Sequence, residues 1–514
     1  MVEGSYADEP AATAYDVVVV GAGLGGLSAA AFLARTGRSV LVIEREEEPG
    51  GYARSFRRGD YLFELAIHII GQGEGLLLGK LLDYLGVADR CRFVRAADVC
   101  ALNFPGFRLS VPAGREAYIS AHAEALAPSE ADGLRRCFEL SQQVHREVHQ
   151  LPPVLSLREL EGAVTRFPTL FRYHSSTLGD LLDECLVDER LKAVVAGMWP
   201  FFGLPPSQLS FFTWCTPFLS LVQDGSWQCL GGSQSLADAL VAAVESQGGE
   251  VICGAPVEQI VVRDGEARGV RLASGREVRA PVVVSGCDAR ATLERLVGQE
   301  HLPGGYLRRV RRMRASLSGC VLYAATTMDL AGLEVSSQEF LHDDWDSDSA
   351  FTEIRSGRPA AAWMNVPTLV DPSLAPAGHH IVVLTTLAPA DTGTPWEDEA
   401  GRYRDALLAL LERRIPGIGA QLTHAEVATP PLFERYSGNW GGALYGWESS
   451  PDQAGGRRLS RVTPVRGLLL SGHWTQPGMG SFRVLFSGVE TTMVVAGQGY
   501  AEEFLHRMGL VPAR

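Results

Sequence analysis

Short apolar runs without a polar face alternate along the chain with longer segments of helical periodicity. The runs at residues 17–20, 39–43 and 282–285 are rich in β-branched residues, which predicts buried parallel strands. Residues 233–246 repeat their apolar positions as a helix does. Further strands, separated by Asp-Gly and Ser-Gly turns, are predicted at 250–253, 257–263, 267–272 and 277–279. This alternation of strands and helices predicts a fold of the α/β class.

Two long segments do not show this alternation of strands and helices. Residues 76–224 carry leucine at helical spacing, first between Leu77 and Leu85, and predict a mainly helical region, whereas residues 301–459 are less regular. Within the first segment, residues 194–222 hold five Phe and two Trp, and prolines are expected to divide the stretch into short pieces. Three interpretations stay open for this stretch: packed core, an apolar substrate tunnel, or a patch that enters one face of a bilayer.

A glycine-rich turn follows the first apolar run. The turn comprises Gly21, Gly23, Leu24, Gly25 and Gly26. Its first glycine permits a tight turn, the second lets the backbone approach a pyrophosphate, and the last lets a helix lie close to the strand. Glu44 ends the second strand, where a carboxylate can accept hydrogen bonds from a ribose. The pattern predicts a dinucleotide site, and a tight turn that binds nothing is the alternative.

Composition narrows the partners and the compartment. The 514 residues include 46 Lys and Arg against 60 Asp and Glu, and the net charge of −14 argues against a nucleic-acid partner. Nine cysteines occur without a C-x-x-C pair, which is typical of a reduced cytoplasm. Residues 1–14 lack Lys, Arg and an apolar core, and no apolar run reaches the roughly 18 residues of a membrane span. We therefore expect a cytoplasmic location.

A second glycine pair indicates which dinucleotide is the ligand. After Glu44 the chain continues through Arg45 to Gly50, Gly51, Arg54 and Ser55. These residues resemble the second glycine pair of flavoproteins with two dinucleotide-binding domains. The resemblance implies that the ligand is FAD, that Glu44 and its neighbour hold the adenosine ribose, and that Arg54 and Ser55 approach the diphosphate.

Two further blocks extend the resemblance over most of the chain. Residues 230–288 and 467–497 are similar to FAD-dependent desaturases of the phytoene desaturase type, which include the carotenoid isomerase and retinol saturase branches. The resemblance implies that Val257 packs on the adenine side of FAD. It also implies that a loop at residues 472–480, here named the flavin loop, leaves room for the isoalloxazine, and that the next helix stabilises negative charge on the flavin. The loop residues assigned to the cofactor are Gly472, Gly478, Met479 and Gly480.

These patterns together predict the domain organisation. We expect a doubly wound, Rossmann-like FAD-binding domain interleaved with a mixed α+β substrate domain. The FAD-binding domain is predicted to comprise residues 10–75, 225–300 and 460–505, and the substrate domain residues 76–224 and 301–459. Tyr436 and Tyr445 resemble residues on the family's approach to the flavin and are expected as tunnel walls.

Candidate catalytic residues flank the glycines nearest the flavin. They are His68, Glu64, His473, Trp474 and Arg483. A structural role is the alternative for each, such as a hydrogen-bonded core imidazole or a backbone anchor. Glu64 stands where relatives commonly carry Asp, and Arg483 would be a costly cation in an apolar site unless it is paired.

The predicted function is that of an FAD-dependent oxidoreductase acting on carbon–carbon bonds of a long apolar or polyene substrate, carotenoid-like or retinoid-like. Desaturation, saturation and cis–trans isomerisation stay open, with quinone or oxygen as electron acceptor and with peripheral contact to a cytoplasmic membrane face. The first alternative is an oxidase of the amine oxidase type with a smaller polar substrate, which should show an aromatic cage and a carboxylate anchor. The second is a protein that holds FAD without catalysis.

Other motifs are excluded by their spacing. His145 and His149 do not form an H-E-x-x-H zinc motif, and the acidic turn that begins at Asp344 lacks the glycine and the glutamate of a calcium loop. We therefore expect no metal. No second G-x-G-x-x-G motif occurs, so no resident nicotinamide domain is expected.

Overall fold

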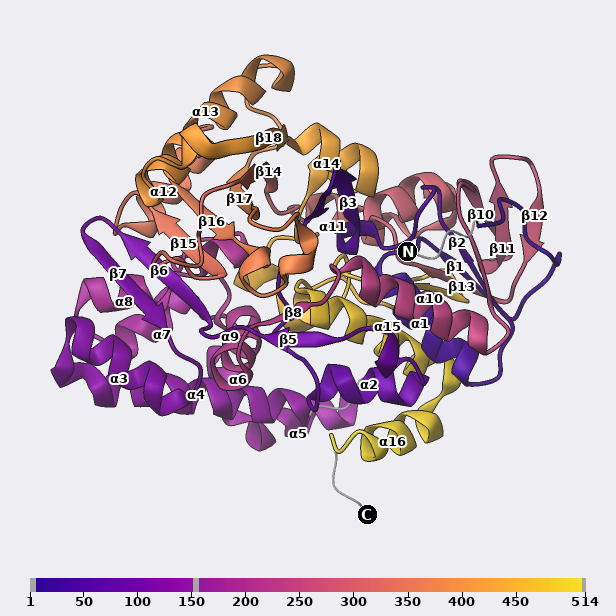
Figure 1. Cartoon of the computed structure of the whole chain (residues 1–514). Helices are drawn as coiled ribbons and strands as arrows, with labels where there is room; N and C mark the ends of the chain where they lie inside the picture. Colours follow the sequence, from indigo (N-terminus) through magenta and orange to yellow (C-terminus); the bar gives the residue numbers. More distant parts are fainter. Residues whose placement is uncertain (1–5, 151–156, 511–514) are drawn as a thin grey trace.

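A parallel sheet of five strands organises one half of the molecule. The computed structural model describes residues 6–150 and 157–510, without the side chains of residue 149 and of 157–161 (Figure 1). Across the sheet the strands are β19 (Leu468–Leu470), β13 (Val282–Ser285), β1 (Val17–Val20), β2 (Val40–Ile43) and β9 (Glu250–Ile252). All four pairings are parallel, and the strands come from three distant parts of the chain.

The two faces of this sheet are covered differently. In β1 the side chains alternate, so that Val17 and Val19 pack against helices while Val18 and Val20 pack against an antiparallel sheet. The helices are α1 (Leu24–Arg35), α2 (Leu77–Leu85), α10 (Gln234–Ser246), α15 (Ser481–Ala496) and α16 (Gln498–Arg507). The other face carries β10 (Val257–Arg263), β11 (Glu266–Leu272), β12 (Glu277–Arg279) and α11 (Gly304–Arg312). The expected Rossmann-like α/β fold is confirmed.

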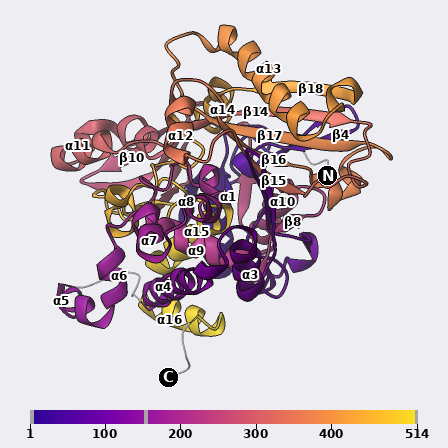
Figure 2. The ribbon, with the colours of Figure 1, turned by 90° about the vertical axis from the view of Figure 1, so that its left-hand side faces the viewer.

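A mixed sheet of seven strands forms the other half. Its order is β18 (Leu422–Ala428), β14 (Ser318–Thr326), β17 (His380–Ala388), β16 (Ala361–Asn365), β15 (Gln338–His342), β6 (Cys100–Phe104) and β7 (Phe107–Val111). Only the pairing of β15 with β6 is parallel within this sheet. One face packs on α13 (Trp396–Arg414), which lies at the top of both views in Figures 1 and 2. The other face is turned toward a helical layer.

The helical layer is built from the first long segment. Its members are α3 (Arg115–Leu126), α4 (Ala131–His149), α5 (Leu157–Arg166), α6 (Pro168–Tyr173), α7 (Leu178–Cys185), α8 (Glu189–Val195) and α9 (Phe211–Asp224). Smaller elements complete the fold: β3 (Ser55–Arg58), β4 (Tyr61–Glu64), β5 (Phe93–Arg95), β8 (Trp227–Cys229), α12 (Ser347–Arg355) and α14 (Pro430–Ser437). One of the helices, α2, begins just after the predicted domain boundary at residue 75 but packs with the helices of the parallel sheet.

The aromatic stretch at residues 194–222 is mainly core. Trp199 and Trp214 are at most 1 % exposed, and the large apolar residues of the stretch that are not buried are only half-buried. The expectation that every proline breaks this stretch is wrong at Pro217, which lies inside the 14-residue helix α9. Phe201 and several neighbours line a cavity, so the tunnel interpretation stays a prediction for this part of the stretch.

Candidate active site

A cavity of about 740 Å³ extends between the parallel sheet and the seven-stranded sheet. Among the predicted site residues, its lining includes Gly21, Gly23, Leu24, Gly25, Glu44, Arg45, Gly50, Gly51, Arg54, His68, Val257, Gly472, His473, Met479, Gly480 and Arg483. It does not include Gly26, Ser55, Glu64, Trp474 or Gly478. The fold therefore brings most of the predicted cofactor residues to one continuous surface, although they come from both ends of the chain.

The first glycine turn lies so close to neighbouring backbone that side chains would not fit, except on the side that faces the cavity. A Cβ added at Gly26 would lie 2.0 Å from the carbonyl oxygen of Gly21, and one added at Gly25 would lie 2.7 Å from Gly472 Cα. At Gly23, by contrast, an added Cβ would meet nothing within 4 Å. Gly23 is also the N-cap of α1 and supplies no side-chain cap. The open space and the bare helix N-terminus fit a diphosphate group.

Glu44 and the second glycine pair hold this turn in place. The carboxylate of Glu44 accepts hydrogen bonds from the backbone N–H of Ala22 (2.7 Å) and of Glu46 (3.0 Å). The N–H of Gly50 donates to the carbonyl of Ala22 (2.8 Å), and a Cβ added at Gly51 would lie 3.2 Å from Gly23 Cα. The second glycine pair thus has a packing role that the resemblance did not describe: it supports the phosphate turn from the side.

The two residues predicted to approach the diphosphate face different ways. Arg54 lines the cavity, and its nearest carboxylate oxygens, on Glu48 and Glu46, are 3.6 Å and 3.9 Å away. Ser55 lies outside the lining, where its hydroxyl accepts a hydrogen bond from the N–H of Gln234 (3.4 Å). Arg54 thus faces the cavity in two long ion pairs, whereas Ser55 anchors the start of α10.

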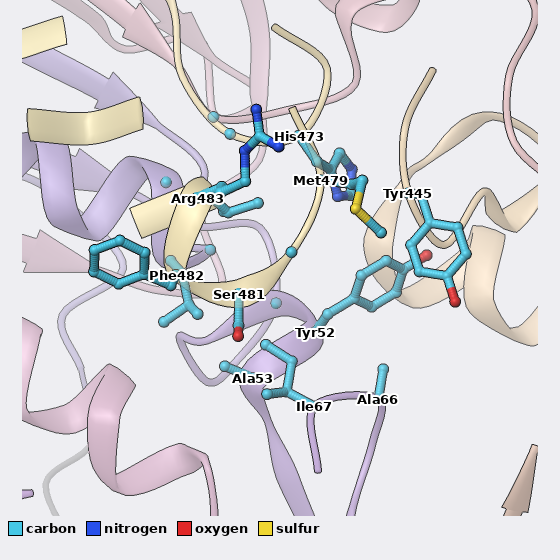
Figure 3. Close-up of a pocket in the computed structure, with 18 of the residues that line it drawn as sticks. Tyr52, Ala53, Ala66, Ile67, Tyr445, His473, Met479, Ser481, Phe482 and Arg483 are labelled. Atoms are coloured by element: carbon cyan, nitrogen blue, oxygen red, sulfur yellow. The ribbon is translucent and has the colours of Figure 1, made fainter. Parts of the chain in front are cut away.

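The flavin loop and the N-terminus of α15 line the cavity at the end away from the first glycine turn's diphosphate site, where the flavin ring is predicted. Ser487 Oγ accepts a hydrogen bond from the N–H of Gly472 (2.7 Å), which ties the loop to α15. Helix α15 begins after Gly480 with no side-chain cap and no acidic residue in its first turn. Figure 3 shows Ser481 at this helix start, between Phe482 on one side and Tyr52 and Tyr445 on the other. A helix N-terminus without a carboxylate favours negative charge beside it.

Arg483 compensates for the proline inside α9. Pro217 has no N–H, so the carbonyl of Thr213, one turn earlier, has no intrahelical donor from it. Arg483 Nη1 donates to this carbonyl (3.3 Å), and Arg483 Nη2 donates to the carbonyl of Pro477 (2.6 Å). Burial lowers the pKa of the Arg483 guanidinium. This cation therefore joins α9 to the flavin loop while it lines the cavity (Figure 3).

Two neutral histidines also line the cavity. Burial lowers the pKa of His68 to about 4, and none of the described residues forms a hydrogen bond with its buried Nδ1. Burial and the charge of Arg458 lower the pKa of His473 to about 3, and its Nε2 lies 3.5 Å from Asn439 Oδ1. At neutral pH both side chains are uncharged, so they can accept or relay a proton but carry no positive charge.

The other two candidate catalytic residues lie away from the cavity. Glu64 is 3 % exposed and accepts hydrogen bonds from the N–H (2.7 Å) and the hydroxyl of Ser233. Trp474 donates from Nε1 to Asn439 Oδ1 (2.8 Å) and its ring packs against Trp447. Each has a complete structural role in these contacts, and a catalytic role stays a prediction.

Some lining residues were not predicted from the sequence. Tyr52 follows the second glycine pair directly; its hydroxyl donates to the carbonyl of Ala443 (3.1 Å), and its ring lies 6.0 Å from that of His473. Its position in the sequence was the available signal. Trp363 was not predicted either; its ring lies 5.3 Å from that of Phe201, which belongs to the aromatic stretch considered as a tunnel wall, and no local pattern indicates their meeting.

No cluster suited to a metal ion occurs among the residues that the structure describes. Asp346, in the acidic turn, caps α12 through the N–H groups of Asp348 and Ser349. Of the histidine pair, His145 lines the cavity, and the side chain of His149 lies outside the described residues. None of the described helices has both the length and the apolar character that a membrane span requires.

Comparison with known proteins identifies the family of this chain. A family model for flavin-containing amine oxidoreductase matches residues 24–489. Phytoene desaturase (neurosporene-forming) of Rhodobacter capsulatus is 27% identical over 92% of each chain. Chloroplastic prolycopene isomerase of Daucus carota is 26% identical over 92% of this chain and 79% of its own, and all-trans-retinol 13,14-reductase of Danio rerio is 25% identical over 89% and 82%.

Solved structures share the fold. An oxidoreductase from Methanosarcina mazei superposes with a TM-score of 0.63 at 18% identity, covering 92% of this chain and 99% of its own. Putrescine oxidase bound to putrescine gives a TM-score of 0.65 at 14% identity, covering 94% and 99%. With the glycine turns and the flavin loop lining one cavity, the matches establish that the chain belongs to the flavin-containing amine oxidoreductase family and is an FAD-dependent oxidoreductase.

Proposed function

We propose that the enzyme acts on a carbon–carbon bond of a long, apolar, conjugated substrate. The observation that carries this proposal is the apolar lining on both sides of the flavin loop. On one side, beneath the seven-stranded sheet, lie Phe201, Phe202, Val321, Trp363, Leu444 and Tyr445; on the other, toward α16, lie Leu77, Val148, Phe482, Phe486, Leu505 and Leu510. Two apolar walls suit a chain whose reactive bond lies between two hydrocarbon ends.

The charges near the flavin loop argue against an amine substrate. Arg483 lines the cavity at this loop, and the guanidinium of Arg458 lies directly behind it. Glu490 lines the cavity too, but its carboxylate is paired with Arg461 (2.6 Å). A protonated amine placed beside these cations would be repelled, whereas a neutral polyene is indifferent to them.

The chain's own residues position the substrate and exclude water. FAD supplies the capacity to accept or donate a hydride, and a desaturation also releases one proton from the neighbouring carbon. His68 and His473, uncharged and in the lining, are the residues we propose to relay that proton, because their lowered pKa values disfavour holding it. A conjugated substrate delocalises developing charge itself, which is why few catalytic side chains are required.

The relatives support this substrate class but span three outcomes. Their names describe a phytoene desaturase, a prolycopene isomerase and a retinol reductase. Anaerobic mixing of the purified holoenzyme with phytoene, prolycopene, retinol and putrescine, each with oxidised and with reduced flavin, distinguishes them. Bleaching of oxidised flavin by phytoene indicates desaturation, conversion of prolycopene without net flavin change indicates isomerisation, and turnover of retinol only by reduced enzyme indicates saturation. Bleaching by putrescine alone would overturn the proposal.

The electron acceptor and the membrane contact are tested separately. We propose quinone or oxygen as the acceptor, because no second dinucleotide motif occurs in the sequence. Stopped-flow reoxidation of the reduced enzyme by a soluble quinone and by oxygen compares the two, and reoxidation by neither would exclude both. Flotation with lipid vesicles tests contact with a membrane face, which would give access to a membrane-dissolved substrate.

A further inference from the structure

Arg458 is a buried cation that the resemblance did not assign. It is 2 % exposed, and its guanidinium donates to four backbone carbonyls. Nη2 reaches those of His473 (2.6 Å), Tyr445 (3.2 Å) and Trp447 (3.2 Å), and Nε reaches that of Thr475 (3.2 Å). No carboxylate among the described residues forms an ion pair with it. A buried charge is normally paired with an opposite charge. Arg458 has only carbonyl oxygens as partners, which leaves its positive charge uncompensated.

The flavin loop is shaped around this guanidinium. A Cβ added at Gly478 would lie 3.2 Å from Arg458 Nε and 3.3 Å from its Cζ. Gly478 does not line the cavity; its positive φ of 113° requires glycine, and the missing side chain also leaves room for Arg458 behind the loop. His473 and Met479, in the same loop, face the cavity. The guanidinium is therefore one layer of residues away from the space at the flavin loop.

Other groups at this end of the cavity add positive potential. Arg483 lines the cavity and donates hydrogen bonds to two carbonyl oxygens, and the carboxylate that interacts with it, Glu490, is already paired with Arg461. The N-terminus of α15 points toward the flavin loop without an acidic residue in its first turn. The burial that lowers the pKa of Arg458 to about 9 still leaves the group protonated at neutral pH. His473, whose pKa is lowered to about 3, adds no charge of its own.

We propose that Arg458 and Arg483 raise the reduction potential of the bound FAD and thereby favour removal of hydride from the substrate. Reduction adds negative charge to a flavin, and uncompensated cations in a buried site stabilise that charge more strongly than they would in water. The inference rests on the proposed function for its consequence, since it selects desaturation over saturation as the favoured direction. The expected effect of the two arginines on the reduction potential does not depend on the substrate.

Arg458→Gln and Arg458→Lys are the matched variants. Gln keeps hydrogen-bond donors for the carbonyls and removes the charge, whereas Lys keeps the charge and loses most of the donors. The midpoint potential of the flavin is measured by equilibration with a reference dye, without substrate, and sulfite affinity is measured from flavin absorbance. In Arg458→Gln we expect a lower potential and a sulfite dissociation constant raised about tenfold or more. In Arg458→Lys both values should stay near those of the wild type.

Two further comparisons keep the test decisive. Arg312→Gln removes one exposed charge from α11, outside the cavity lining, and should change neither value. If Arg458→Gln does not retain FAD, the pair Arg483→Gln and Arg483→Lys gives the same comparison. Equal shifts in the Gln and Lys variants, or no shift in either pair, would overturn the proposal. Because no substrate is present, failure here leaves the proposed substrate class intact, and a different substrate class would leave a measured shift in potential intact.

Discussion

The diphosphate end of the cavity is built from backbone, whereas the flavin-loop end is built from long side chains. At the first end, recognition depends on glycines whose added Cβ atoms would collide with the chain, as at Gly26, or would fill the ligand's space, as at Gly23. At the second end, Arg483 and Arg458 each donate to carbonyls of distant segments. The difference teaches that the shape of the first end is set by the absence of side chains, and the charge of the second end by long side chains from distant segments.

The largest effect is expected at the backbone-built end. Gly26→Ala places a methyl group 2.0 Å from the carbonyl oxygen of Gly21, a contact with rigid backbone that can be relieved only by moving α1 away from β1. We expect loss of bound FAD and a destabilisation of at least about 3 kcal/mol. Flavin content per protein and thermal unfolding measure the two effects. Gly499→Ala in α16, where an added Cβ meets nothing within 4 Å, is the control and should retain FAD.

Titration of Glu64, which lies outside the cavity, should make the free energy of unfolding depend on pH. Burial raises the pKa of Glu64 to about 7, so between about pH 4.5 and pH 7 the native state binds a proton that the unfolded state has lost. The stability that protonated Glu64 contributes is therefore fully present below the unfolded pKa. About 3 kcal/mol of the free energy of unfolding is lost as pH rises through 7. Urea unfolding at about pH 5 and about pH 8 should show a smaller fall for Glu64→Gln than for the wild type. Equal falls would place the titration elsewhere.

Substitution of Glu44 tests whether a single side chain contributes to FAD binding at the end of the cavity that is built from backbone. Glu44→Gln removes the charge from a group that accepts two backbone hydrogen bonds and faces the predicted ribose. We expect the dissociation constant of FAD to rise roughly tenfold to a hundredfold. Isothermal titration of the apoprotein measures it. Glu47→Gln removes the same charge from an exposed position outside the lining, and a similar loss there would show that net charge alone is responsible.

The smallest effect is expected in the apolar wall beneath the seven-stranded sheet. Phe201→Ala removes a ring that packs on Phe340 (4.8 Å) and Trp363 (5.3 Å) and faces the cavity. We expect KM for a polyene to rise about tenfold with flavin content unchanged. Phe107→Ala, outside the lining, deletes the same ring without this change. Loss of FAD in Phe201→Ala would mean that the two ends of the cavity are not independent.

The same contrast explains what could be predicted from the sequence. The strand at 17–20 and the helix after it are specified by local periodicity and by glycines in a fixed order, and the structure has β1 at Val17–Val20 and α1 from Leu24. Pro217 shows the limit: its helix continues because Arg483, far along the chain, satisfies the carbonyl that the proline leaves free. No local rule contains that partner.

Side-chain direction was a second limit. Adjacent residues can face opposite sides, so proximity to a glycine in the sequence does not place a side chain in the cavity. His473 lines the cavity while Trp474 packs behind it, and Arg54 lines the cavity while Ser55 does not. The assignments of Glu64 and Trp474 rested on proximity to glycines, and that of Ser55 on the resemblance; tertiary contacts decided the orientation of all three.

The hydrogen bond from Ser471 Oγ to the carbonyl of Gly25 joins residues that are 446 positions apart. During synthesis at roughly 5 to 20 residues per second, the phosphate turn therefore leaves the ribosome some 20 to 90 seconds before the loop that completes its pocket. Until then the nascent chain has no finished flavin site. FAD can therefore find its complete site only after residues 471–480 have been made.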